Sequence, residues 1–193
     1  MTKRTITLLG TNHLINKQSL IEYVYKSLPL RLKLNRKVNR EHIQEHLTVH
    51  GLIYHPFWVA KTLVIADRKP FPPKKSPNMI FIDGVSHYRG LFANIPELTD
   101  VTVNKRQNII QADLTKNEVI KYIKDVQFSQ INRTYLLKKP DHEIVDYFIT
   151  YLPLWTGKVD SPYWQEHLYI NANTGELETH LSKLWLNKEK ISL

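Results

Sequence analysis

The chain of 193 residues contains no cysteine, which excludes a disulfide-stabilised fold, a thiol nucleophile and any thiolate metal site. No apolar run approaches the roughly 18 residues that a membrane-spanning helix needs, and the first twenty residues lack the apolar segment of a secretory signal. Glycine is scarce, with six residues, and neither a phosphate-binding glycine loop nor a G-x-S-x-G nucleophile motif occurs. We therefore expect a cytoplasmic protein without a transmembrane segment, a cofactor or catalytic residues.

Positive charge, by contrast, is abundant and unevenly distributed. The chain has 27 Lys and Arg against 18 Asp and Glu, a net charge of +9. Residues 1–100 hold 15 basic and 7 acidic side chains, a net charge of +8, and residues 101–193 are near neutral at +1. A basic surplus confined to one half predicts a surface that engages an acidic partner.

The basic residues of the first half fall into two clusters, which we predict to bind the partner. They are Arg31, Lys33, Arg36, Lys37 and Arg40 in the first cluster, and Arg68, Lys69, Lys74 and Lys75 in the second. No helix-turn-helix, zinc-finger or RNP signature accompanies them, so protein, nucleic acid and an anionic surface all stay open as the acidic partner. The alternative is that these side chains only keep an exposed strand edge soluble.

An internal repeat organises the chain. The segment Tyr54–Lys61 recurs 97 residues later as Tyr151–Lys158, with Tyr, Pro, Trp and Lys in register. A second strand follows each copy, at residues 79–84 and 167–172, and a helix-patterned segment precedes each. We therefore expect an α+β fold of two tandem helix-plus-antiparallel-sheet units, residues 1–100 and residues 101–193.

Local patterns predict the elements of each unit. Apolar residues at three- and four-residue spacing predict helices after Ser19 and after Thr115, the latter with Glu118 in capping-box spacing. Alternation predicts a strand over residues 30–34, with Arg31 and Lys33 on one face. We also expect a helix from Arg40 to His50, begun by Asn39 and ended by Gly51, a counterpart helix over 141–149, and a turn over 67–78.

Two further expectations concern prolines and the end of the chain. A proline within each Tyr-x-Pro-x-Trp strand predicts an edge position or a strand start, since proline cannot donate to the ladder. Leu181, Leu184 and Trp185 predict a short amphipathic helix. The apolar stripe 181–186 and the exposed strand edges favour an alternative function, a structural component that assembles into homo-oligomers.

The Tyr-x-Pro-x-Trp strand, followed by a strand that ends near Asn173-Thr174-Gly175-Glu176, resembles the strand pair of cystatin-like and PepSY-type bacterial modules. The resemblance covers only the strand pair in each half, and Asp83-Gly84 in the first half lacks the Thr-Gly-Glu ending. It implies one helix packed on an antiparallel sheet, often in tandem copies, and a non-enzymatic binding or inhibitory role.

A histidine-rich string suggests one enzymatic alternative. His42, Glu45 and His46 form the H-x-x-E-H motif, which resembles that of inverzincin proteases. The resemblance implies a zinc-dependent hydrolase, with His42, His46 and the distant Glu118 as ligands and Glu45 as the general base. The metal would lower the pKa of bound water to about 7. Because only these residues match, we expect no metal and favour a binding or accessory protein.

Overall fold

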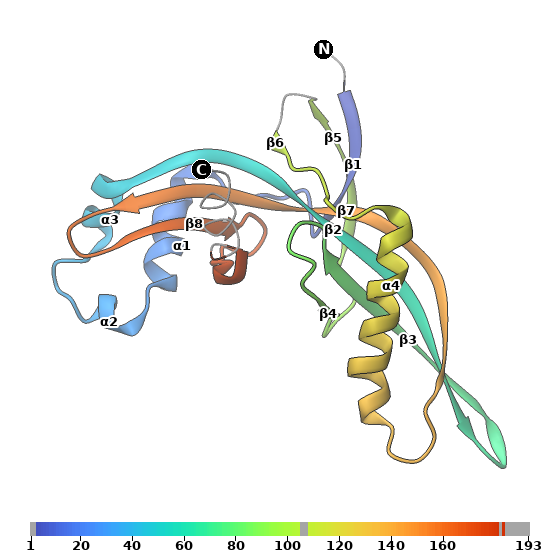
Figure 1. Cartoon of the computed structure of the whole chain (residues 1–193). Helices are drawn as coiled ribbons and strands as arrows, with labels where there is room; N and C mark the ends of the chain where they lie inside the picture. The colour runs from blue at the N-terminus through green and yellow to red at the C-terminus, as the bar shows by residue number, and fades with distance from the viewer. Residues whose placement is uncertain (1–2, 105–107, 182, 184–193) are drawn as a thin grey trace.

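In the computed structural model, residues 3–104, 108–181 and 183 are described, and their strands form one bent eight-stranded sheet (Figure 1). The strand order is β4-β3-β2-β7-β1-β5, with β6 beside β2 and β8 beside β7. The strands are β1 (Lys3–Leu9), β2 (Leu47–Arg68), β3 (Phe71–Asp83), β4 (Arg89–Leu91), β5 (Leu98–Asn104), β6 (Asn108–Ile109), β7 (Asp141–Asp160) and β8 (Gln165–Asn171). The helices are α1 (Leu20–Ser27), α2 (Leu30–Lys33), α3 (Arg40–His46) and α4 (Lys116–Val126), with 3-10 turns η1 (Lys17–Ser19) and η3 (Asn132–Thr134) and a π-helical turn η2 (Gln127–Ile131).

Two very long strands, β2 and β7, run through the whole sheet. They have 22 and 20 residues and pair antiparallel from Leu47 opposite Val159 to Ile65 opposite Asp141. Their Tyr-x-Pro-x-Trp motifs face each other, with His55 opposite Leu152 at the centre. The two copies of the repeat therefore meet about a local pseudo-two-fold axis, and their strands join into one continuous sheet.

The prolines lie in interior strands, so the expectation of an edge position is wrong. Pro56 directly precedes Phe57, whose pairing with Asp83 ends the β2–β3 ladder. The Pro56 carbonyl accepts a hydrogen bond from the Gly84 amide at 2.9 Å. Pro153 is equivalent, because its carbonyl accepts from the Ala172 amide at 2.9 Å. The nitrogen and the carbonyl of a residue point to the same side of a strand. The nitrogen of each proline therefore faces the end of the hairpin ladder, where the absence of an N–H donor is tolerated.

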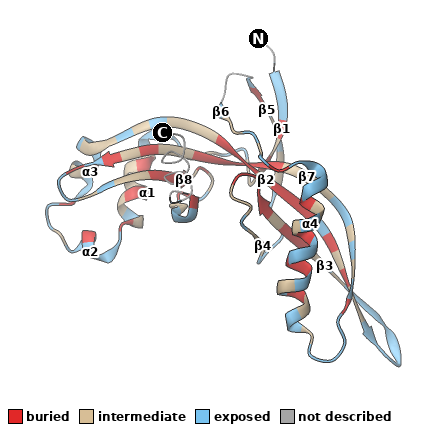
Figure 2. Ribbon diagram, in the orientation of Figure 1, coloured by how far each residue is buried: buried red, intermediate tan, exposed pale blue. Residues whose placement is uncertain are grey.

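The prediction of two tandem helix-plus-sheet units is wrong. One large mixed sheet dominates, with 46% strand and 25% helix. Each helix also packs against the hairpin of the other half. Leu20 and Val24 of α1 pack with Leu168 of β8, and Val119 and Ile123 of α4 pack with strands β2 and β3. In Figure 2 the buried residues lie along the middle of the long strands, on β8 and on the part of β3 beside α4, whereas the tip of the β2–β3 hairpin is exposed.

Three local expectations are also wrong. Residues 30–33 form the helix α2, and the amide of its C-cap Leu34 donates to the Leu30 carbonyl at 3.0 Å, so Arg31 and Lys33 do not share a strand face. Residues 141–149 form the first part of β7, because they pair with β2. Residues 67–78 are mostly paired strand, and the long loop becomes a projecting β-hairpin.

The local helix signals fared better. Helix α1 begins at Leu20, although the Ser19 side chain makes no capping bond. Helix α4 begins at Lys116, directly after its N-cap Thr115, which forms the complete capping box with Glu118. Asn39 caps α3 through the His42 amide, but α3 ends at His46 and the chain enters β2 directly, short of Gly51.

The expected C-terminal helix lies only partly within the described residues. Residues 179–181 are helical and Leu181 is buried, but Leu184 and Trp185 lie outside the described residues. Among the helices that the structure describes, none is both long and apolar enough to cross a membrane.

Candidate functional site

The two predicted basic clusters lie at opposite ends of the molecule. The first surrounds α2, and the second occupies the tip of the β2–β3 hairpin at the far end of the bent sheet (Figure 1). The nine residues therefore do not form one surface, and each cluster has to be judged by its own contacts.

The first cluster is largely engaged within the protein. Arg40 binds the Glu22 carboxylate and lies over the Tyr25 ring, with 4.3 Å from its guanidinium carbon to the ring centroid. The Lys33 ammonium donates to the Lys26 carbonyl at 2.6 Å, and the Lys37 ammonium lies 5.7 Å from the centre of the Tyr163 ring. These side chains support the fold around α1 and α3. The remaining members, Arg31 and Arg36, are exposed.

The second cluster faces solvent. Strand β2 ends at Arg68 and β3 begins at Phe71, so the chain reverses within residues 69 and 70. Every residue from 67 to 75 is exposed. We call Arg68, Lys69, Lys74, Lys75 and Phe71 the basic tip. Among the residues that the structure describes, no carboxylate lies within ion-pair distance of the four basic side chains of the tip.

A second segment, the loop of residues 132–140 between α4 and β7, lies beside the base of the basic tip. Its Lys138 ammonium is 2.6 Å from the Asp67 carboxylate. The hydrogen bond from Lys138 and the charges of Lys138 and Lys69 outweigh partial desolvation and lower the pKa of Asp67, while Asp67 raises the pKa of Lys138. At neutral pH this ion pair ties the loop to the hairpin.

The loop also exposes large apolar side chains. Leu136 and Leu137 are 93% and 101% exposed, and Phe71 of the basic tip is 68% exposed. Lys139, next to them, donates to the carbonyls of Asn132 and Tyr135 and holds the loop in shape. This end of the protein therefore presents both free positive charge and uncovered apolar surface. The apolar part escaped the sequence analysis, because a sequence does not reveal which leucines remain uncovered.

The zinc alternative is not assembled. His42 and His46 lie on α3 with their rings stacked, their centroids 4.2 Å apart. Glu118 instead caps α4 at the other end of the sheet, where its carboxylate accepts from Thr115 and its pKa is lowered by those hydrogen bonds. Within the described residues, no three histidine, aspartate or glutamate side chains gather as metal ligands would.

His55 and Asp83, which no pattern in the sequence pairs, lie together in the interior of the sheet. His55 Nε2 lies 3.0 Å from Asp83 Oδ1, and both side chains are 1% exposed. Burial raises the pKa of Asp83, but the hydrogen bond and charge of His55, together with the amides of Ser86 and Val85, outweigh it and leave that pKa below its usual value. A buried charge held in this way beside a cavity is a second candidate site.

Comparison of the chain with protein-family models, curated proteins and solved structures gave no match in any of the three. The resemblance to cystatin-like and PepSY-type modules therefore stays a prediction. The geometry of this chain alone carries the functional argument.

Proposed function

We propose that this chain is a non-enzymatic binding protein whose basic tip and neighbouring loop engage an anionic phospholipid surface. The observation that carries the proposal is the combination of four basic side chains, which have no ion-pair partner among the described residues, with the exposed Phe71, Leu136 and Leu137 at one end of the protein. Peripheral membrane proteins bind in this way, with apolar side chains in the interface and basic side chains near the anionic headgroups. The cytoplasm, where anionic lipids face the protein, is the location that we propose.

The apolar side chains favour lipid over nucleic acid. A single-strand binding surface uses several aromatic rings to stack bases, and the basic tip has one, Phe71. Fully exposed leucines such as Leu136 and Leu137 contribute nothing to phosphate recognition, whereas burial of apolar surface in a bilayer interface is favourable by about 25 cal/mol per Å². Nucleic acid and acidic proteins are the other partners to be tested.

The test is co-sedimentation of the protein with vesicles of phosphatidylcholine, with and without about 30% phosphatidylserine. Each basic residue near an anionic surface contributes about 1 kcal/mol. The double variant Lys74→Glu/Lys75→Glu should therefore bind the anionic vesicles on the order of 100-fold more weakly than the parent. Leu136→Ser/Leu137→Ser should also weaken binding, but without changing its dependence on salt.

The matched control is Arg31→Glu/Arg36→Glu, which reverses two exposed charges at the opposite end of the protein and should bind nearly as the parent does. Equal weakening by both charge reversals would show that net charge, and no particular surface, drives binding. Failure to bind anionic vesicles at low salt would refute the proposal. Tight binding to labelled DNA or RNA in the same buffer would then support nucleic acid as the partner.

A further inference from the structure

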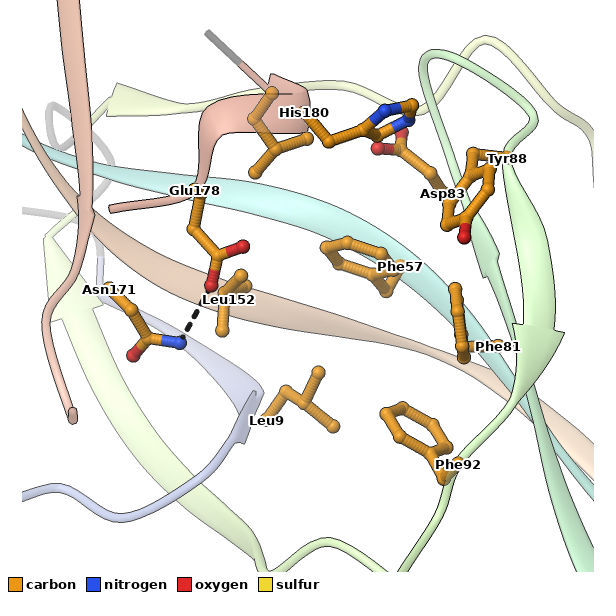
Figure 3. A pocket seen from close by; sticks show the side chains of 11 residues that line it. Leu9, Phe57, Phe81, Asp83, Tyr88, Phe92, Leu152, Asn171, Glu178 and His180 are labelled. Atoms are coloured by element: carbon orange, nitrogen blue, oxygen red, sulfur yellow. Dashed lines mark hydrogen bonds between the residues drawn. The ribbon is translucent and has the colours of Figure 1, made fainter. Parts of the chain in front are cut away.

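A cavity of about 300 Å³ lies on the sheet, on the face opposite Trp58, beside the centre of the pseudo-two-fold axis. Alternation along β2 and β7 puts Phe57 and Leu152 on this face. Figure 3 shows the rings of Phe57, Phe81 and Phe92 along one side of the cavity, facing Leu152 and Leu9. The cavity is at the lower end of the size range of small-molecule sites and is mostly apolar, as such sites are.

Besides Tyr88, Asn171 and His180, the polar side chains of its lining are acidic. Asp83 and Glu178 both line the cavity, and no lysine or arginine of the described residues does. This is notable in a chain with a net charge of +9, because the cavity departs from the sign of the whole protein. Glu178 is held by the side-chain amide of Asn171, which donates to Oε1 at 3.1 Å (Figure 3).

The two carboxylate oxygens of Asp83 differ in their hydrogen-bond partners among the described residues. Oδ1 accepts from the amides of Val85 and Ser86, at 2.8 and 2.9 Å, and lies 3.0 Å from His55. Oδ2 is buried and accepts no hydrogen bond from any residue that the structure describes. A buried carboxylate oxygen without a donor is costly, so a donor supplied by a ligand would be favourable there.

The rim carries two further rings. Tyr88 and His180 lie with their ring centroids 4.4 Å apart, Tyr88 in the turn before β4 and His180 in the helical segment 179–181. Tyr88 also contacts Phe81, at 5.9 Å between centroids. Aromatic faces attract cations through their quadrupole. These rings and the two carboxylates therefore both favour a positively charged ligand.

We propose that this cavity binds a small organic amine, with its ammonium group at Asp83 Oδ2 and near Glu178 and its apolar part against the phenylalanine rings. The proposal is independent of the basic tip, which lies at one end of the sheet. A neutral ligand of the same shape would leave Asp83 Oδ2 with a weaker donor, and an anion would meet two carboxylates.

The test measures binding of three matched probes to the full chain by NMR titration and calorimetry: phenethylamine, 2-phenylethanol and phenylacetate. A charge-assisted hydrogen bond is stronger than a neutral one by an amount that corresponds to about tenfold in affinity. We therefore expect phenethylamine to bind about tenfold or more tightly than 2-phenylethanol, and phenylacetate not to bind. Amide shifts should appear at Phe81, Tyr88 and His180.

The variant Asp83→Asn should lose the preference for the amine, and Asp160→Asn, which alters an exposed carboxylate on β7, should keep it. If Asp83→Asn does not fold, the probe series and the shift map on the parent protein still decide. Equal affinity for the amine and the alcohol, amine binding that shifts residues elsewhere, or no binding of phenethylamine at about 10 mM, the weak limit for so small a ligand, would each overturn the proposal.

Discussion

The buried pair of His55 and Asp83 gives the sharpest prediction for stability. The change is His55→Leu, which introduces the residue that the second repeat carries at the equivalent position, Leu152. Removing His55 takes away the side chain beside the buried Asp83 carboxylate, and the loss of one partner from such a buried pair costs about 3–5 kcal/mol. Two amides, from Val85 and Ser86, still serve Asp83 Oδ1, so we expect the lower end, about 3 kcal/mol at pH 7.

The loss should depend on pH in a definite direction. In the parent protein the folded pKa of Asp83 lies below its unfolded value of 3.8. Its contribution is therefore present above pH 3.8 and is lost as the pH falls through the folded pKa. In His55→Leu, burial acts without the histidine and raises the folded pKa, so the variant binds this proton more readily than the parent. The stability difference should shrink as the pH is lowered from 7 toward 4.

Urea denaturation followed by circular dichroism at pH 7, 5.5 and 4 measures both effects. His55→Leu/Asp83→Asn should regain part of the loss at pH 7, because it removes the unpaired charge. Lys158→Leu, which breaks the exposed pair with Asp160, should change stability little. A deficit below about 1 kcal/mol, or one that stays constant over this pH range, would refute the conclusion that His55 stabilises the buried Asp83 carboxylate.

Two further predictions follow from the helices. Thr115→Ala should destabilise the protein by about 1 kcal/mol in the same urea assay, since it removes the hydroxyl of the α4 capping box. The control Ser19→Ala, at a position without a capping bond, should cost less. Equal losses of stability in the two variants would contradict the role of the cap. The two halves of the chain, produced separately as residues 1–100 and residues 101–193, should each lack a cooperative unfolding transition and should regain it when mixed, since each helix covers the hairpin of the other half. A cooperative unfolding transition in either fragment alone would contradict this packing.

The sequence predicted what short-range physics decides. The capping box of Thr115 and Glu118 lies within one turn of chain, and spacing alone revealed it. The two Tyr-x-Pro-x-Trp segments are strands because their β-branched and aromatic residues suit a half-buried pleated surface. The proline and lysine content of residues 67–78 predicted a turn, whereas the structure pairs most of this segment as strand.

What the sequence did not predict is decided by partners far along the chain. Residues 141–149 resemble a helix in their spacing, but pairing with β2 makes them a strand. Residues 30–34 alternate like a strand, but none of the described strands pairs with them, and a single turn of helix that buries only Leu32 forms instead. The packing of each helix on the hairpin of the other half joins residues far apart in the chain, such as Val24 with Leu168, and local patterns do not reveal such contacts.

The duplication explains why both candidate sites involve the first repeat. The strand register makes Asp83 equivalent to Asn171 and His55 equivalent to Leu152. Asp83, Asn171 and Leu152 line the cavity at the pseudo-two-fold axis, and His55 lies beside Asp83. The second repeat supplies neutral side chains where the first supplies a buried charge. The hairpins differ likewise, since the second is short and closes through residues 161–164. The buried carboxylate of Asp83 and the charges of the basic tip therefore belong to the first repeat, whereas the second repeat supplies Leu152, Asn171 and Glu178 to the cavity and the helix α4 that packs on the β2–β3 hairpin.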